Sequence, residues 1–99
     1  MIKPENLKHF IWVEKGTQRK AVMKALSAKM TPSLIRKVSQ KFNEKISLSN
    51  TSDILKCLVN RGLAVCLNSE EKRGRLYELT ETGKEVRENL LEAESLLNQ

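Results

Sequence analysis

The sequence has little of what an enzyme or a metal centre needs. Among its 99 residues there is one histidine, His9, and there are two cysteines, Cys57 and Cys66, which form no CxxC motif. The carboxylates offer no nucleophile–base pair at motif spacing, and the four glycines stand apart and form no phosphate-binding loop. We therefore expect a protein that is not an enzyme, with no catalytic residues, no metal site and no cofactor.

Export and membrane signals are also missing. The sequence has no signal peptide and no long apolar run, which predicts a cytoplasmic protein without a membrane partner. In that compartment Cys57 and Cys66 are expected to be reduced thiols, and nothing in the sequence assigns them a redox role. Aromatic residues make up only 4% of the chain, so leucine, isoleucine and valine must build most of the core.

What the sequence has in excess is positive charge. It carries 18 lysines and arginines against 12 acidic residues, which gives a net charge of +6 and a pI of about 9.6. This balance favours a polyanionic partner, either nucleic acid, an anionic membrane or an acidic protein. Many small domains carry as much charge for solubility alone, so the choice between these depends on the sequence patterns.

The start of the chain predicts two helices. Residues 1–16 indicate a short N-terminal helix, although their FIWV run also suits a strand. Thr17 is a good N-cap, and the apolar residues that follow it recur at helical spacing up to residue 29. The helix over 17–29 is therefore expected to be the first of a core.

A Thr-Pro pair indicates the start of the next helix. Thr31 can cap it and proline suits its first position, which predicts a helix over residues 32–43. Its buried stripe is expected to consist of Ile35, Val38 and Phe42. Ile46, beyond that helix, is expected to form a single-bridge strand at the edge of a later hairpin.

The organising stretch of the sequence begins with a helix over residues 49–61. Ser49 and Asn50 are both N-cap residue types. Four residues share an inward face, namely Thr51, Ile54, Leu55 and Leu58. The opposite face is small and polar, with Ser49, Asp53, Lys56 and Asn60, and with Asn50 and Ser52 beside them. Such a face suits reading of a DNA major groove, although any exposed helix face is polar.

A hairpin with a basic turn follows the helix. Gly62 is expected to end the helix in a left-handed conformation. The segments LAVCL and RLYEL then predict two strands, joined by the turn NSEEKRG. That turn places Lys72, Arg73 and Arg75 around a glycine. The order of helix, glycine, strand, basic turn and strand is more specific than any of its parts.

The final helix is expected to begin after Thr80, another N-cap candidate, and to cover residues 81–98. A narrow apolar seam runs along it, formed by Val86, Leu90, Ala93 and Leu97 at spacings of 4, 3 and 4. We assign this seam to a dimer contact. A single helix that packs back on its own domain would use the same residues.

These elements predict an α+β, mostly helical fold of the winged helix-turn-helix type. The fold would consist of a three-helix core and a β-hairpin wing, preceded by an N-terminal segment and followed by a long C-terminal helix. Residues 1–99 are expected to form one domain, with its core over 17–80 and the possible dimerisation helix over 81–98.

The DNA-binding residues expected from this layout fall into two groups. Lys72, Arg73 and Arg75 would contact phosphates or the minor groove, with helix N-termini at Thr17, Thr31 and Ser33 as secondary phosphate contacts. Ser49, Asn50, Ser52 and Lys56 would discriminate bases, and an asparagine–adenine pair is worth about 1–3 kcal/mol. Asp53 would stabilise the start of the helix.

From Arg19 to Val86 the sequence resembles winged helix-turn-helix regulators of the MarR/ArsR type, especially small archaeal members. One motif is Leu58 followed by Gly62 and Leu63. The other consists of Arg73, Gly74, Arg75, Tyr77, Leu79, Thr80, Gly83, Lys84 and Glu85. The segment KFNEKISLSN is longer and more polar than the turn usual in those regulators.

The resemblance implies a homodimer that binds operator DNA with one reading helix per half-site and the wings on flanking backbone. We therefore expect a sequence-specific regulator of transcription that binds double-stranded DNA. The alternative is a winged-helix protein–protein interaction module without DNA binding. The basic wing and the polar reading face favour DNA. No effector, operator or direction of regulation is indicated.

Overall fold

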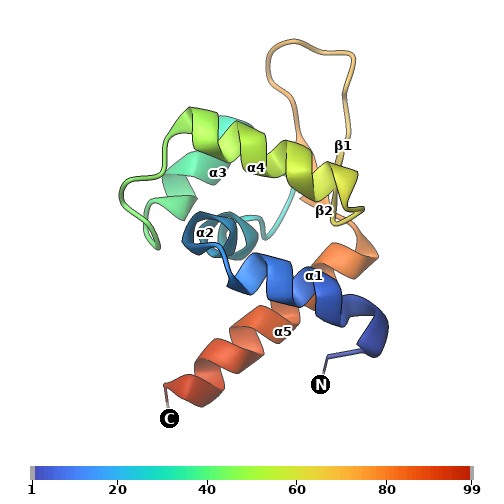
Figure 1. Ribbon diagram of the computed structural model, residues 1–99. Helices are drawn as coiled ribbons and strands as arrows, with labels where there is room; N and C mark the ends of the chain where they lie inside the picture. The colour runs from blue at the N-terminus through green and yellow to red at the C-terminus, as the bar shows by residue number, and fades with distance from the viewer. Residues whose placement is uncertain (1, 99) are drawn as a thin grey trace.

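The computed structural model describes residues 2–98 as five helices and a two-stranded antiparallel hairpin (Figure 1). The elements are α1 (Pro4–Glu14), α2 (Thr17–Ala25), α3 (Pro32–Ser39), α4 (Leu48–Asn60), β1 (Ala64–Cys66), β2 (Tyr77–Leu79) and α5 (Glu81–Leu97). Helices α2, α3 and α4 pack together, and α1 and α5 lie on the side away from the loop that joins the strands. This arrangement confirms the expected mostly helical, winged helix-turn-helix architecture.

The first segment is a helix and not a strand. Pro4 occupies the start of α1, where its missing N–H has no partner to lose. Gly16 does not close α1 in a left-handed conformation, since its φ is −113°. It is instead the N-cap residue of α2, one position before the predicted cap Thr17.

Helix α2 ends at Ala25, about one turn earlier than its apolar spacing predicts. Arg87 of α5 donates from Nε to the carbonyl of Met23 (3.0 Å) and from Nη2 to that of Lys24 (2.9 Å). In a longer helix these carbonyls would accept bonds from the next turn. The Arg87 side chain therefore supplies the hydrogen bonds that the backbone of the next turn would have made.

Helix α3 is also shorter than predicted. The Thr31 hydroxyl accepts a hydrogen bond from the backbone N–H of Leu34 (3.3 Å), as an N-cap should. The helix stops at Ser39, so Phe42 falls in the turn beyond it and leaves the buried stripe. Phe42 is 50% exposed, and the ammonium group of Lys24 lies 4.6 Å from the centre of its ring. The prediction that Phe42 is buried is therefore wrong.

The single-bridge strand is formed by Met30 and not by Ile46. Met30 and Tyr77 exchange two backbone hydrogen bonds, of 3.0 and 2.9 Å, and so add a short third segment to the hairpin edge. Ile46 is 1% exposed and belongs to the core. The early end of α2 frees Met30 to reach β2, whereas Ile46 supplies apolar surface to the interior.

All five helices and both strands contribute side chains to the buried core. On α4, three of the four residues of the predicted inward face, Thr51, Leu55 and Leu58, are fully buried. The fourth, Ile54, is half-buried and packs against the core from its edge. Between residues 2 and 98 no helix combines the length with the apolar character that a membrane span requires.

The predicted dimer seam of α5 is divided between the interior and the surface. Val86 and Leu90 are 0% exposed and lie in this chain's own core, so their assignment to a dimer contact is wrong. Helix α5 packs against α1, α2 and β2, and the side chains that fill this contact have no surface left for a partner. Ala93 is partly exposed and Leu97 is 82% exposed, so only the outer end of the seam is available.

Polar bonds fix α1 on α5. Glu85 accepts from the Lys3 ammonium group (2.9 Å) and from the side-chain amide of Asn6 (2.6 Å). The hydrogen bond from Lys3, followed by that from Asn6, lowers the pKa of Glu85 below its ordinary value. Asn6 is only 4% exposed, so its polar group has the partner that burial requires.

The base of the hairpin is joined to the start of α5 by a close contact. The Thr80 hydroxyl donates to the carbonyl of Gly62 (2.6 Å) and accepts from the N–H of Gly83 (3.1 Å). The N–H of Thr80 donates to the carbonyl of Leu63 (3.0 Å). A Cβ atom at Gly83 would lie only 1.9 Å from that carbonyl oxygen, so only glycine lets the two backbones approach so closely.

Gly83→Ala is therefore expected to destabilise the fold, although alanine normally favours a helix. Overpacking of this kind costs about 1–3 kcal/mol, which urea denaturation followed by circular dichroism will measure. Glu88→Ala, at an exposed position of the same helix, is the matched control and is expected to change stability little. Equal stability of the two variants would show that the contact is not close.

Candidate nucleic-acid interface

A cleft of about 620 Å³ lies between the start of α3, one side of α4 and the loop that joins β1 and β2. We call this loop, residues 67–76, the wing. The cleft is lined by Thr31, Pro32, Ser33, Leu48, Ser52, Lys56, Lys72, Arg73, Gly74, Arg75 and Tyr77. Seven of the ten DNA-binding residues expected from the sequence are in that set. Thr17, Ser49 and Asn50 are not.

The start of α4 differs from the prediction in a way that matters for Asn50. Ser47 is the N-cap residue, and it forms a reciprocal capping box with Asn50. Oδ1 of Asn50 accepts from the N–H of Ser47 (3.2 Å) and from its hydroxyl (2.7 Å). Both lone pairs of this oxygen are therefore in use. A bidentate pair with adenine needs the same oxygen, so the geometry speaks against Asn50 as a base reader.

The remaining residues of the expected reading face lie at the surface. Ser49, Asp53 and Lys56 are exposed, and Ser52 is half-buried at the edge of the cleft. Leu48 is 44% exposed in the cleft, and it was missed because the helix was predicted to begin one residue later. An apolar side chain at this place suits contact with a thymine methyl group.

The wing is held from within by one asparagine. Oδ1 of Asn68 accepts from the N–H of Leu76 (2.7 Å), and its Nδ2 donates to the carbonyl of Gly74 (3.0 Å). Arg75 donates from Nε to the carbonyl of Glu71 (2.7 Å), and Gly74 has a φ of +67°, which favours glycine. Sequence reasoning missed Asn68. The available signal was an asparagine at the entry of a long turn, where such side chains bond to the backbone.

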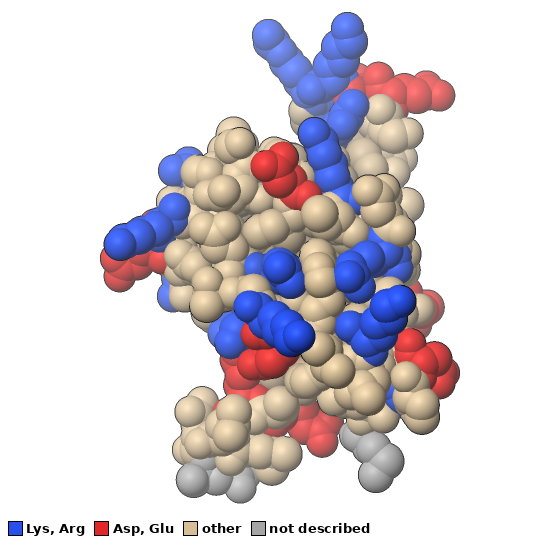
Figure 2. Space-filling model, in the orientation of Figure 1, with Lys and Arg blue, Asp and Glu red and all other residues tan. Residues whose placement is uncertain are grey.

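The cleft is strongly positive. Lys56, Lys72, Arg73 and Arg75 line it, and its lining includes no carboxylate. None of these four residues forms an ion pair within residues 2–98. Figure 2 shows several of the basic side chains that gather at the wing, with acidic side chains beside its tip. Unpaired cations around a concave surface favour a polyanionic ligand.

The start of α3 adds polar donors to this surface. The Thr31 hydroxyl accepts from Leu34, which leaves its own O–H free to donate. Ser33 is exposed in the first turn, near backbone N–H groups that have no partner inside the helix. These groups suit a phosphate.

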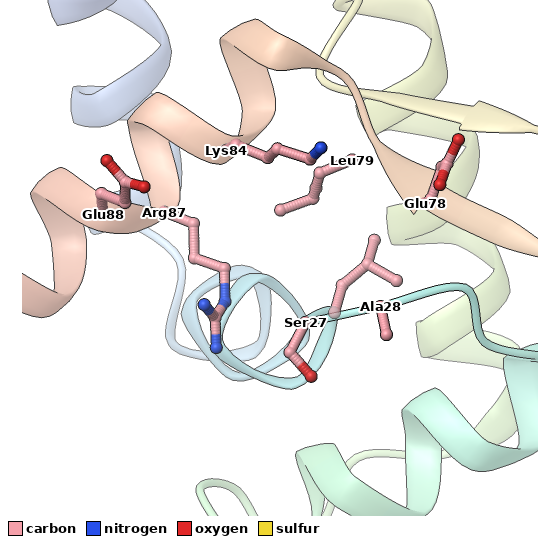
Figure 3. Close-up of a pocket in the computed structure, with 8 residues that line it drawn as sticks. Ser27, Ala28, Glu78, Leu79, Lys84, Arg87 and Glu88 are labelled. Atoms are coloured by element: carbon pink, nitrogen blue, oxygen red, sulfur yellow. The ribbon is translucent and has the colours of Figure 1, made fainter.

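A smaller pocket of about 220 Å³ lies between α5, β2 and the segment after α2 (Figure 3). Its lining combines Glu78 and Glu88 with Lys84 and Arg87. The guanidinium of Arg87 is already bound to the end of α2, so this pocket is mainly a structural junction. In the part of the chain described, no cluster of three His, Cys, Asp or Glu residues is arranged to hold a metal ion.

The comparisons with known proteins identify the fold. No family model and no curated protein matches this sequence. The crystal structure of a MarR family transcriptional regulator from Silicibacter pomeroyi DSS superimposes with a TM-score of 0.63 and 25% sequence identity. The match covers 95% of this chain and 58% of that regulator, so this chain spans little more than half of its length.

The fold is therefore a MarR-like winged helix, which is the fold of a transcriptional regulator. The resemblance to MarR-type regulators inferred from residues 19–86 is confirmed at this level. The narrower resemblance to archaeal members is not supported, since the matching protein is from Silicibacter pomeroyi.

Asn68→Ala is expected to loosen the wing and leave the core folded, because it removes the two bonds from the Asn68 side chain to the loop backbone. Hydrogen exchange should speed up at the Leu76 amide while the amides of α4 keep their protection. Ser69→Ala, at the next and exposed position of the wing, is the matched control. Unchanged protection of Leu76 in Asn68→Ala would rule out the bracing role.

Proposed function

We propose that this chain is a sequence-specific, double-stranded DNA-binding regulator of transcription that acts as a dimer in the cytoplasm. In this proposal α4 enters the major groove and the wing lies on the backbone or in the minor groove. The observation that carries the proposal is the cleft, which gathers seven separately inferred residues, four of them cationic, between α3, α4 and the wing. The MarR-like fold supports the same conclusion.

The phosphate contacts come from two sides of the cleft. Lys72 and Arg73 are exposed on the wing and can follow a DNA strand, whereas Arg75 is tied to the loop through its Nε atom. Thr31 and Ser33 offer hydroxyl groups from the start of α3. Neutralising phosphates releases counterions, so binding by these residues should depend steeply on salt.

Base discrimination falls to the exposed side of α4. Ser52 and Lys56 face the cleft, Ser49 lies beside them, and Leu48 offers a contact for thymine methyl groups. Asn50 keeps a place in the proposed interface as the residue that fixes the helix start through its bonds to Ser47. Its role is thus to position the reading helix.

The dimer contact is proposed for the outer end of α5. Leu96 is 61% exposed and Leu97 is 82% exposed, and with Ala93 they form apolar surface beyond the buried part of the helix. Their burial against a second copy would remove this surface from water. Two copies would present two α4 helices to two half-sites.

The variant Lys72→Ala with Arg73→Ala is expected to weaken binding to all duplexes alike and to lower the slope of log affinity against log salt by about 2. Fluorescence anisotropy of labelled duplexes at several salt concentrations measures both effects. Lys84→Ala, which removes an exposed charge on α5, is the control and should leave the slope nearly unchanged. Wild-type binding that ignores salt, or no binding, would favour the protein-interaction module.

The variant Leu96→Glu with Leu97→Glu is expected to be a monomer at concentrations at which the unaltered chain is a dimer, because like charges would face each other across the contact. Sedimentation equilibrium at high micromolar concentration distinguishes the two states. Leu34→Glu places the same kind of change on the exposed side of α3 and should leave the dimer intact. A monomeric unaltered chain would end the dimer proposal.

A further inference from the structure

A second basic surface lies on the side of α4 that faces away from the wing cleft. Arg61, which caps the end of α4, and Arg19 in α2 both lie over the ring of Trp12 in α1, at 4.1 and 4.6 Å from its centre. Lys15 and Arg19 also line a shallow hollow that includes Ile54 of α4. Figure 2 shows basic side chains gathered over α1 and α4, separate from those of the wing.

The Arg19 side chain is held in one place. It donates from Nη1 to the backbone carbonyl of Trp12, and its guanidinium stacks on the Trp12 ring. Gly16 makes room for it, since a Cβ there would lie 2.6 Å from Nε and 2.8 Å from Cδ of Arg19. One bond uses one of the five donors of the guanidinium, so a fixed fork remains for a ligand. A side chain that is already ordered loses little entropy on binding.

The positive charges of this surface are not neutralised by the chain itself. Lys8 of α1 and Lys15, the C-cap residue of α1, lie on the same side as Trp12, because positions 8, 12 and 15 fall on one side of a helix. Neither these lysines nor Arg19 and Arg61 form an ion pair within residues 2–98. Burial, followed by the charges of Arg61 and Lys8, lowers the pKa of the neighbouring His9.

The two basic surfaces lie on opposite sides of one helix. Leu48, Ser52 and Lys56 face the wing cleft, whereas Ile54 and Arg61 face Trp12 and its neighbours. Between them Ser49, Asp53 and Asn60 form an exposed crest. A helix about 10–12 Å across fills a major groove about 12 Å wide, so the phosphates of the two strands lie along its two sides.

We propose that Arg19 and Arg61, held on Trp12, together with Lys15 bind the phosphodiester backbone of the DNA strand opposite to the one that the wing contacts. This inference rests on the proposed function and names a second contact surface for the same duplex. An acidic protein would be drawn to the same charges. Arg61 belongs to the end of α4 itself, so any duplex read by α4 passes beside this surface, which favours DNA.

The variant Arg19→Gln with Arg61→Gln tests the charges. We expect it to weaken duplex binding several-fold and to lower the salt slope by about 2, as the wing variant does. Within each half-site, hydroxyl-radical footprinting should then lose protection on one strand only, and the wing variant should lose it on the other strand of the same half-site. Lys84→Gln is the control for a lost surface charge.

Gly16→Ala tests the placement of Arg19 without a change of charge. The new methyl group should move Arg19 off the ring, weaken duplex binding and alter the fluorescence of Trp12, which is the only tryptophan in the chain. Urea denaturation confirms that the variant is folded.

The two proposals fail differently. If the Arg19 and Arg61 variant binds as the unaltered chain does while the wing variant is weakened, this inference is overturned and the proposed function stands. Binding of an acidic protein would then be the remaining explanation for the charges of Arg19 and Arg61. If the unaltered chain binds no duplex, the proposed function falls and this inference falls with it.

Discussion

The position of α4 relative to the wing depends on a backbone contact between the first turn of α5 and Leu63. Gly83 has no side chain to hold these two backbones apart, and Thr80 bonds to both Gly62 and Gly83 at the same place. Gly62, with a φ of +74°, turns the chain out of α4 at this point and into β1. The end of α4, the base of the wing and the start of α5 are thereby fixed by a few atoms.

From that junction towards the end of the wing, fewer backbone hydrogen bonds hold the chain in place. The two strands pair over three residues each, so the hairpin is short. Beyond it the N–H of Leu67 donates to the carbonyl of Leu76 (2.8 Å), and the N–H of Glu71 donates to the carbonyl of Asn68 (3.0 Å). The side chain of Asn68 and the bond from Arg75 to Glu71 hold the rest of the wing. Lys72, Arg73 and Arg75 form no ion pair within residues 2–98, and they belong to a loop whose base is fixed by the paired strands.

The most accurate predictions from the sequence concern helix ends and turns, which depend on interactions between residues close together in the chain. Thr31 before a proline, Gly62 after a helix and Thr80 before the final helix each act within a few residues, and each has the predicted role. The seven residues of the cleft were also found, because the order of helix, strand, basic turn and strand determines which side chains meet.

The wrong predictions concern residues whose position depends on contacts with elements far away in the sequence. Met30 replaced Ile46 in the bridge because β2 binds it, and Phe42 left the core because α3 ends at Ser39. Val86 and Leu90 have a heptad-like spacing that fits a dimer as well as a core, and only the packing of α5 on α1 and α2 distinguishes the two. The role of Asn50 depended on a helix start one residue earlier than predicted.

The bonds from Arg87 to the last carbonyls of α2 make the length of that helix a property of the whole fold. An excised peptide over residues 17–31 would lack the guanidinium that stops it at Ala25 and would have no fixed point of termination. The non-helical segment that follows Ala25 also contains Met30, which pairs with Tyr77 of β2. Arg87 of α5 thus determines where the chain ends α2, and with it which residue pairs with β2 at the edge of the hairpin.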